Sequence, residues 1–207
     1  SNINVTECLF LSKILDLHIR NCQPSYSILE IGMAYGTSSM MIANVLNRFG
    51  EIAFNYEIVD PNQKKQWHSY GIHNLKTIKS PDYDFNLHIG KSHPVMNTLI
   101  KNEKKFDFVF IDGAHDYQTV VGDLDRAIKL AGTNCVIVMD DVLQDGPKRA
   151  IEKFQKKLTK VCIQDDQLVI DNFEITRDKS DNDPASMHAF LVSDSIKKEY
   201  PLRNFAD

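Results

Sequence analysis

The sequence predicts an α/β protein in which one domain is built on a central, mostly parallel seven-stranded sheet with helices on both faces. Short apolar runs alternate with stretches of helical spacing, which is the pattern of a parallel sheet covered by helices. The length of 207 residues suits a single domain with a sizeable core. The composition, 43% hydrophobic and 25% charged, is that of an ordinary soluble globular protein.

Three parts are expected along this single domain, residues 1–207. Residues 1–24 form an N-terminal helix, 25–150 the ligand-binding core, and 151–207 a C-terminal helix with antiparallel strands. In the first part, "VTECLFLSKILDLHI" places apolar residues at helical spacing, which predicts a helix from about residue 4 to 21.

The first half of the core contains two strands and two helices. "SILEIG" is a short buried strand closed by Gly32, and "TSSMMIANVLNRF" is a helix that ends near Gly50. "AFNYEIVDP" is a second strand, stopped by its Asp-Pro pair. A polar stretch of helical spacing follows at about 62–70.

The second half of the core repeats this alternation. "DFNLHIG", "FDFVFID" and "CVIVMDD" are predicted strands. The helices after them are "HPVMNTLIKNEKK", with Pro94 in its first turn, residues 117–131, and "PKRAIEKFQKKL", which Pro147 opens. "KVCIQ" and "MHAFLV" complete the seven strands, and the polar segment 176–185 is expected to be a loop.

Charge and hydropathy limit the partners. There are 24 basic and 28 acidic residues, so the net charge of −4 argues against a nucleic-acid partner. The apolar runs are too short to span a bilayer, and no signal peptide is visible, so we expect a cytoplasmic protein without a membrane partner. The four cysteines show no metal or disulfide spacing and are expected to be reduced. A small-molecule substrate is expected; the oligomeric state stays open, with a homodimer as one candidate.

Five predicted strands end in polar or glycine-rich residues. The carboxyl ends of parallel strands meet at one edge of the sheet, where ligands bind. The residues at these ends are Glu30-Ile31-Gly32, Asp60, Gly90-Lys91-Ser92-His93, Asp112 and Asp140-Asp141.

The turn after the first strand has the pattern E-x-G-x-x-x-G, in which Gly32 and Gly36 allow a tight turn and a close approach to a ligand. The middle glycine of a dinucleotide motif is missing, which favours a nucleoside ligand without a pyrophosphate. Asp60, at the end of the second strand, can accept hydrogen bonds from ribose hydroxyls. The alternatives are a packing role for the glycines and a surface turn at Asp60-Pro61.

Five segments in this order, "LEIGMAYGTSS", "VDP", "HIGKSH", "FDFVFIDGAHDY" and "VIVMDDV", resemble the class I S-adenosylmethionine-dependent methyltransferases. The likeness covers about residues 25–150 and is closest to the small metal-dependent O-methyltransferases, such as the catechol enzymes and related sugar and natural-product enzymes. It implies a Rossmann-like methyltransferase fold and S-adenosyl-L-methionine as cofactor.

The resemblance also implies roles for single residues. Glu30, Gly32 and Gly36 would line the methionine end of the cofactor, with Ser38 near its carboxylate, and Asp60 would hold the ribose. The residues that follow the third and fourth strands complete the implied cofactor site: Ser92 and His93 toward the adenine, together with Gly90 and Asp112.

A divalent cation is the next implication, with Asp112, Asp140 and Asp141 as ligands. Independently of the resemblance, three carboxylates at one edge repel one another unless a cation neutralises them. All-oxygen ligands suit Mg²⁺, which would favour ionisation of a substrate hydroxyl. The alternative is that Asp140 and Asp141 cap the following turn while Asp112 contacts only the cofactor.

His115 stands where the metal-dependent enzymes carry a catalytic lysine. The unperturbed pKa of imidazole, about 6.5, allows it to accept a proton near neutral pH, so we expect a general base, with Asp116 as a candidate to orient the ring. The alternative is a loop histidine that packs on Tyr117 or caps the next helix.

These observations predict metal-assisted O-methylation of a small molecule with a sugar or phenolic hydroxyl. Three alternatives remain. An N-methyltransferase would often carry Asn/Asp-Pro-Pro-aromatic where this chain has "DGAHDY", and a nicotinamide-dependent oxidoreductase would want the missing glycine. The third is an interaction module that binds the cofactor without catalysis.

Overall fold

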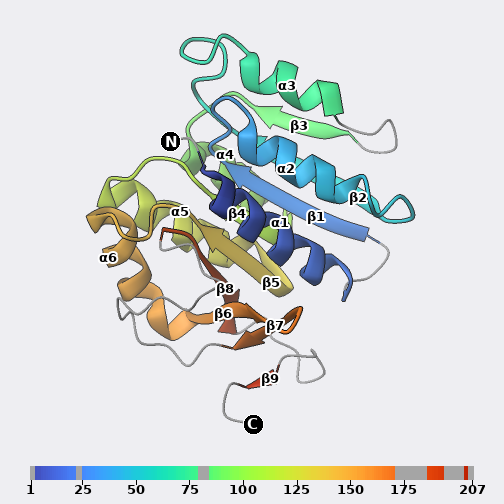
Figure 1. Ribbon diagram of the computed structural model, residues 1–207. Coiled ribbons are helices and arrows are strands. Elements are labelled where there is room, and N and C mark those ends of the chain that lie inside the picture. Colours follow the sequence, from blue (N-terminus) through green and yellow to red (C-terminus); the bar gives the residue numbers. More distant parts are fainter. Residues whose placement is uncertain (1–2, 22–24, 79–83, 171–185, 194–202, 205–207) are drawn as a thin grey trace.

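One continuous sheet organises the computed structural model, which describes residues 3–21, 25–78, 84–170, 186–193 and 203–204 (Figure 1). The strand order is β3-β2-β1-β4-β5-β8-β6-β7-β9. The bounds are β1 Ser25–Ile31, β2 Ala53–Val59, β3 Phe85–His88, β4 Phe106–Ile111, β5 Ala131–Met139, β6 Leu158–Gln164, β7 Gln167–Ile170, β8 His188–Val192 and β9 Arg203–Asn204.

The first five strands in chain order pair in parallel, as predicted for a Rossmann-like sheet. β8 then runs antiparallel to β5, and β6 and β7 continue the sheet antiparallel. The expected count of seven was too low, because β7 and the short β9 extend the edge. β7 forms a hairpin with β6 through Asp165 and Asp166, which both have positive φ, as a two-residue hairpin turn requires.

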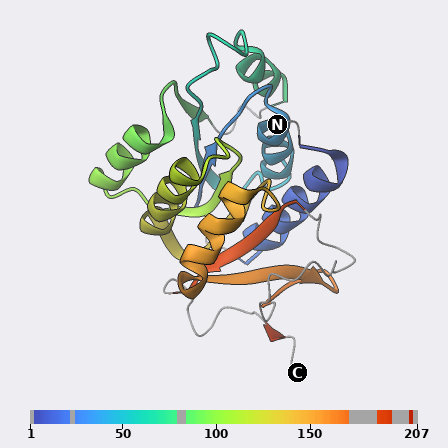
Figure 2. The ribbon, with the colours of Figure 1, turned by 90° about the vertical axis from the view of Figure 1, so that its left-hand side faces the viewer.

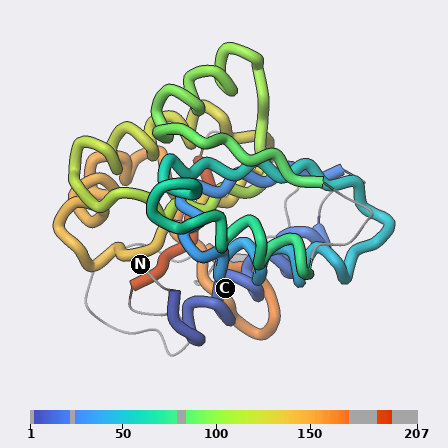
Figure 3. Tube along the Cα trace, turned by 90° about the horizontal axis from the view of Figure 1, so that it is seen from above, coloured from blue at the N-terminus to red at the C-terminus, as the bar shows by residue number. Residues whose placement is uncertain are grey.

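Helices cover both faces of the sheet (Figures 2 and 3). Their bounds are α1 Val5–Ile19, α2 Thr37–Leu46, α3 Tyr70–Ile78, α4 Ser92–Lys101, α5 Tyr117–Leu130 and α6 Asp145–Phe154, with a 3₁₀ turn at Gln155–Lys157. α1, α2 and α3 contribute to the core on one face, and α4, α5 and α6 to the core on the other. Within the described residues, no helix has both the length and the apolarity needed to cross a membrane.

The strand β4 shows how the sequence divides between the two cores. Phe108 and Phe110 pack on the side of α1 to α3, whereas Val109 and Ile111 pack on the side of α4 to α6. Successive side chains of a strand point to opposite faces, so a strand buried on both faces is a continuous apolar run. Such a strand ends where polar residues begin, here at Asp112.

The helix expected at 62–70 was misplaced. Residues 61–69 form turns instead, and α3 begins at Tyr70. His68 and Ser69 have φ of 47° and 63°, and left-handed residues interrupt a right-handed helix. The helix expected to reach residue 158 is also shorter, because β6 begins at Leu158. The loop expected at 176–185 lies outside the described residues.

Candidate functional site

The ends of β1, β4 and β5 are locked in register at one edge of the sheet. The amide of Gly32 donates to Val59 O at 2.9 Å, that of Asp112 to Ile31 O at 2.9 Å, and that of Asp140 to Ile111 O at 3.0 Å. The parallel ladder therefore continues one residue past each strand. It fixes the backbone from which Asp112 and Asp140 project.

Two glycines shape the turn between β1 and α2. Gly32 and Gly36 have φ of +91° and +84°, a conformation that residues with a Cβ adopt only under strain. A Cβ at Gly32 would clash with the carbonyl of Asp112, and one at Gly36 would lie 2.8 Å from Gly71 O. Close approach of three backbone segments therefore requires glycine at both positions.

Asp60 fixes the backbone of this turn through hydrogen bonds. Its side chain is 3% exposed, and it accepts hydrogen bonds from the amides of Met33 at 3.1 Å and Ala34 at 2.8 Å. The amide of Asn62 and the side chain of Gln63 also donate to it, at 2.7 Å and 3.1 Å. The carboxylate expected to hold a ribose is thus bonded to donors of the chain itself, and it orders the loop that a cofactor would contact.

Glu30 is fully buried beneath α2 and does not line the edge of the sheet. It accepts hydrogen bonds from the hydroxyls of Ser38, Ser39 and Tyr56, the bond from Ser39 being 2.7 Å long. Burial raises the pKa of Glu30 to about 7, although these hydroxyls oppose the shift. Glu30 therefore anchors the first turn of α2 to β1. Ser38 lines the pocket, and Glu30 does not.

An open pocket lies above the turn. Its walls come from the β1–α2 turn, the start of α2, the end of β4 and the residue before the cap of α1: Met33, Ala34, Tyr35, Thr37, Ser38, Asp112 and Ile3. Four of these, Ile3, Met33, Ala34 and Thr37, carry no chemistry that sequence reasoning would single out. The presence of Ile3 shows that the N-terminal segment folds over the site.

The residues expected near an adenine connect two helices. His93 Nε2 lies 3.0 Å from Thr119 O and 3.3 Å from Asp123 Oδ1, which joins the first turn of α4 to α5. Burial raises the pKa of Asp123, while the neighbouring Ser92 and the charge of His93 oppose the shift. Neither Ser92 nor His93 lines the pocket, and Gly90 is half-buried in the turn before them.

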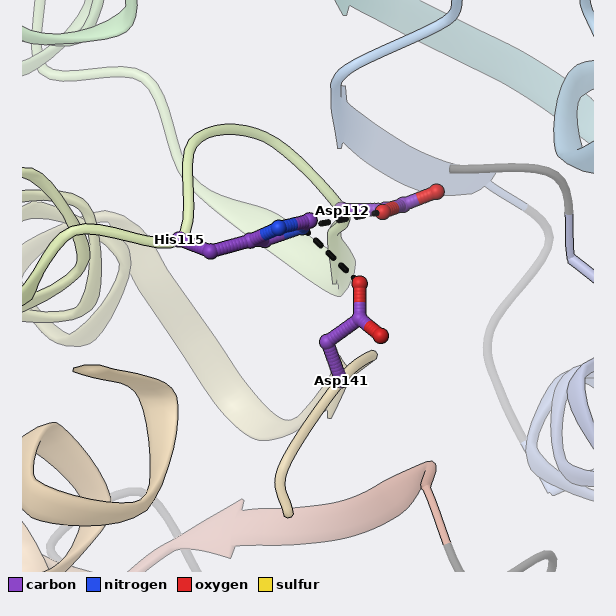
Figure 4. A group of neighbouring side chains, drawn as sticks. All are labelled: Asp112, His115 and Asp141. Carbon is purple, nitrogen blue, oxygen red and sulfur yellow. Dashed lines mark ion pairs between the residues drawn. The ribbon is translucent and has the colours of Figure 1, made fainter. Parts of the chain in front are cut away.

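Asp112, His115 and Asp141 come together beside the pocket (Figure 4). His115 Nε2 lies 2.8 Å from Asp141 Oδ2 and 4.0 Å from Asp112 Oδ1. One ligand atom from each residue falls within 4.8 Å of the others, a spacing that can hold a metal ion. The sequence predicted the two carboxylates as ligands and His115 as their neighbour.

Asp140 does not belong to this group of three. It is buried and uses Oδ1 to accept the amide of Asp141 at 2.8 Å. Burial, and then the charge of Asp112, raises the pKa of Asp140 to about 7. Asp141 adopts φ of 55°, and its carboxylate lies with Asp112 and His115 in a group that does not include Asp140.

The loop that carries His115 is held by α6. A Cβ at Gly146, in the first turn of α6, would clash with the carbonyl of His115. The pKa of His115 is raised, first by the neighbouring carboxylate of Asp112 and further by the charge of Asp141, whereas burial lowers it. Asp116 does not orient the ring as expected, because it caps α5 by accepting the amide of Thr119 at 3.0 Å.

Glu7 and Ser186 complete the region, and neither was predicted. Glu7 accepts a hydrogen bond from Ser186 Oγ, and Ser186 O accepts the amide of Val142 at 2.8 Å. These contacts tie the start of α1 and the residues before β8 to the segment after β5. Asn4 and Glu7 form a capping box, and this N-x-x-E pattern is the signal by which the sequence could have placed the helix start.

Comparison with known proteins agrees with this geometry. The profile of a family described as a methyltransferase domain matches residues 29–142, more than half of the 207 residues. An uncharacterized protein, R132, of Acanthamoeba polyphaga mimivirus is 32% identical over 117 residues. That match covers 54% of this chain and 49% of R132, so the chain spans about half the length of this curated relative.

Two solved structures share the fold. An O-methyltransferase from Bacillus cereus in complex with SAH is 17% identical, with a TM-score of 0.60 over 92% of this chain and 82% of that one. CalS11, a TDP-rhamnose 3′-O-methyltransferase of calicheamicin biosynthesis, is 11% identical, with a TM-score of 0.61 over 90% and 78% of the two chains. At these identities the likeness establishes the fold.

Proposed function

Because the chain belongs to the methyltransferase domain family, we propose that it transfers the methyl group of S-adenosylmethionine to a hydroxyl oxygen of a small molecule. A divalent cation assists the transfer, and the hydroxyl belongs to a sugar or a phenol. The two structural neighbours support the choice of oxygen, since both are O-methyltransferases of the same fold.

The observation that carries the proposal is that Asp112 belongs both to the pocket and to the group of three side chains. It lines the pocket formed by the β1–α2 turn, and it is also one corner of the group with His115 and Asp141. A cofactor in the pocket and a hydroxyl beside His115 would therefore meet at one residue. Proximity of this kind is the main requirement of group transfer.

The pocket suits S-adenosylmethionine, which supplies a methyl group on a positively charged sulfur when bound. Met33 and Ala34 of the glycine turn form one wall of the pocket, and Ser38 and Asp112 offer polar side chains. Asp60 contributes by fixing the turn, and Glu30 by anchoring α2.

The donor set also fits a divalent cation. Oδ2 of Asp141 is buried, and carboxylate oxygens of Asp112 and Asp141 lie within 4.8 Å of one another. Asp112 and Asp141 would hold the ion, and His115 stands beside them. When bound, the ion lowers the pKa of a coordinated hydroxyl.

We assign His115 as the proton acceptor. Its Nε2 faces the two carboxylates, and Asp141 at 2.8 Å orients the ring. As the oxygen–methyl bond forms and the methyl–sulfur bond breaks, the hydroxyl proton passes to His115. Its raised pKa means that the neutral, proton-accepting form of the ring predominates only at a higher pH than for a free imidazole.

The test combines binding with turnover. Calorimetry should show that the protein binds S-adenosylmethionine and S-adenosylhomocysteine. Incubation with isotopically labelled cofactor and a panel of sugars and phenols should yield an O-methylated product by mass spectrometry. Chelator should abolish turnover and Mg²⁺ or Mn²⁺ restore it.

Matched carboxylate variants separate the roles. Asp141→Ala should lose turnover and keep cofactor binding, whereas Asp125→Ala, on the exposed side of α5, should behave as wild type. Methylation on nitrogen, or tight NADH binding without any response to S-adenosylmethionine, would replace the proposal with one of the alternatives. Cofactor binding without turnover on any acceptor class would favour an inactive interaction module.

A further inference from the structure

An aromatic cluster stands next to the pocket. The ring of Tyr35 lies 5.0 Å from that of Trp67 and 6.4 Å from that of Tyr70, measured between centroids. Tyr35 and Tyr70 are 44% and 55% exposed, which is unusual for large rings that touch one another. Tyr35 also lines the pocket together with Asp112, so the cluster and the candidate site are continuous.

Hydrogen bonds and turns of the chain position this surface. Asn74 donates to Tyr35 O at 3.0 Å, and Gln63 donates to Ala34 O at 2.6 Å. Ala34, His68 and Ser69 all have positive φ, although none is glycine. Strained residues of this kind persist where the surrounding structure enforces them, and they gather at binding sites.

The same segment is basic in an acidic protein. Residues 61–81 contain four lysines and two histidines and no acidic residue, whereas the whole chain has a net charge of −4. Lys64 and Lys65 are exposed and precede Trp67 in a compact series of turns, closed by bonds such as Ser69 N to Gln63 O at 2.7 Å. Positive charge therefore accompanies the aromatic rings.

The opposite end of the site is negative, with Asp112, Asp140 and Asp141 on one side and Glu7 nearby. The proposed cation would neutralise part of that charge, whereas the exposed ammonium groups of Lys64 and Lys65 would attract the phosphate group of an acceptor. Its ring would stack on the exposed aromatic side chains, which offer an apolar face open to water. Charge complementarity thus sets the direction in which an acceptor would lie.

We propose that Tyr35, Trp67, Tyr70, Lys64 and Lys65 form a docking surface for the phosphate-bearing ring portion of the acceptor. This inference rests on the proposed function, because it places the reacting hydroxyl at the end with His115. It goes further by assigning a chemical class: a small molecule with a sugar, base or aryl ring and a phosphate group. A free nucleic acid is the competing occupant, and the net negative charge of the chain disfavours it.

Trp67 is the single tryptophan of the chain, so its fluorescence reports directly on this surface. Uridine monophosphate, phenyl phosphate and glucose 1-phosphate are titrated in parallel with uridine, phenol, glucose and inorganic phosphate. We expect at least one phosphorylated ring to change the emission saturably, with affinity roughly tenfold or more above that of its neutral counterpart and of phosphate alone. The affinity should fall as salt is added.

Variants locate the binding. Lys64→Ala/Lys65→Ala should weaken it roughly three- to tenfold, whereas Lys156→Ala/Lys157→Ala, with the same charge change in the 3₁₀ turn, should not. Tyr70→Ala should weaken it roughly tenfold through lost stacking. S-adenosylhomocysteine affinity, measured by calorimetry, should stay unchanged in all three variants and shows that they are folded.

The outcomes separate this inference from the proposed function. Equal affinity for phosphorylated and neutral rings, or an unaltered Lys64→Ala/Lys65→Ala variant, overturns it even when methyl transfer is observed. A uridine oligonucleotide could also bind more tightly than the monophosphates, without competition from them or from the cofactor. That result overturns the inference in favour of a nucleic-acid partner. Saturable, lysine-dependent binding of a phosphorylated ring supports it even when no methyl transfer to that probe occurs.

Discussion

At the scale of single residues, the proposed chemistry depends on an imidazole that lies beside two carboxylates. Replacing His115 with alanine should reduce turnover roughly 10²- to 10⁴-fold if the ring accepts the proton, with cofactor affinity nearly unchanged. The pH dependence of turnover on the methyl acceptor, measured for both proteins, tests the role. If the variant keeps the wild-type rate across the acidic limb of the profile, the ring has only a structural role.

A second residue-scale prediction concerns His18, which is fully buried away from the site. Its Nε2 lies 2.9 Å from Asn134 O, an acceptor, so Nε2 carries the proton and Nδ1 accepts from the Tyr26 hydroxyl at 2.5 Å. Burial lowers the pKa of His18 to about 4. The unfolded chain therefore takes up a proton at higher pH than the folded protein, and stability falls as pH drops from about 6.5 to 4.

Urea denaturation between pH 7 and 4 checks this. Protonation of His18 should contribute of the order of 3 kcal/mol to the fall in wild-type unfolding free energy over that interval. The His18→Gln protein should lack this contribution and lose less stability. Comparing the two proteins cancels the opposing contribution of Glu30, whose raised pKa favours the folded state at low pH. Parallel pH profiles for the two proteins would show that His18 is not responsible.

The sequence identified residues at strand ends well, because position after an apolar run is a local property. Asp112, His115 and Asp141 were singled out in this way, and they meet in the structure. The environment of Glu30 and Asp60 could not be predicted. Their partners, such as Ser39 and the amide of Ala34, are known only once α2 and the turn have packed.

At the scale of elements, the junction of β1, α2 and β4 depends on Gly32. In Gly32→Ala the added methyl group would meet the Asp112 carbonyl in a left-handed backbone conformation. We expect a loss of roughly 2–4 kcal/mol in unfolding free energy, and loss of cofactor binding. Thermal melting and calorimetry measure the two effects.

Gly50→Ala is the matched control for Gly32→Ala. Nothing lies within 4 Å of a Cβ placed at Gly50, and the residue is exposed. This variant should be neutral or slightly stabilising, since alanine restricts the unfolded chain. If both alanine variants melt alike, the close packing of strand ends is not what selects glycine at position 32.

Element boundaries followed the sequence wherever apolar periodicity was strong, as in α5 and β4. They failed at 62–70, because polar residues at helical spacing do not reveal the left-handed backbone of His68 and Ser69. β7 was missed because four residues give too little alternation, although the Asp165-Asp166 pair before it is a turn signal.

At the scale of the whole molecule, the parallel sheet concentrates acidic residues at one edge. β4 and β5 deliver Asp112, Asp140 and Asp141, and α1 adds Glu7 from the other end of the sequence. The apolar interior drives the sheet to form, and the carboxylates are brought together at some cost in stability. The pKa of Asp140 is raised by burial and then by the charge of Asp112, and both causes belong to that cost.

The last prediction follows from this accumulation of charge. The pKa of Asp140 is about 7 in the folded protein and lies near 3.8 when the residue is free, so the folded state holds the proton at higher pH. Metal-free stability should consequently fall as pH rises from about 4 to 7. Asp140→Asn, whose amide oxygen can still accept from Asp141 N, should raise the unfolding free energy at pH 8 by about 1–2 kcal/mol.

A divalent cation should relieve the same repulsion in the wild-type protein. Mg²⁺ at 100 times its Kd would add about 2.7 kcal/mol to the unfolding free energy, and chelator would remove the gain. Asp141→Asn should abolish this response, because Asp141 belongs to the cluster with Asp112 and His115. Denaturation at pH 8 with and without Mg²⁺ gives the unfolding free energies of wild type, Asp140→Asn and Asp141→Asn. An equal gain in unfolding free energy from Mg²⁺ in wild type and Asp141→Asn would place the cation elsewhere. The negative charge of the carboxylates would then be compensated by His115 alone.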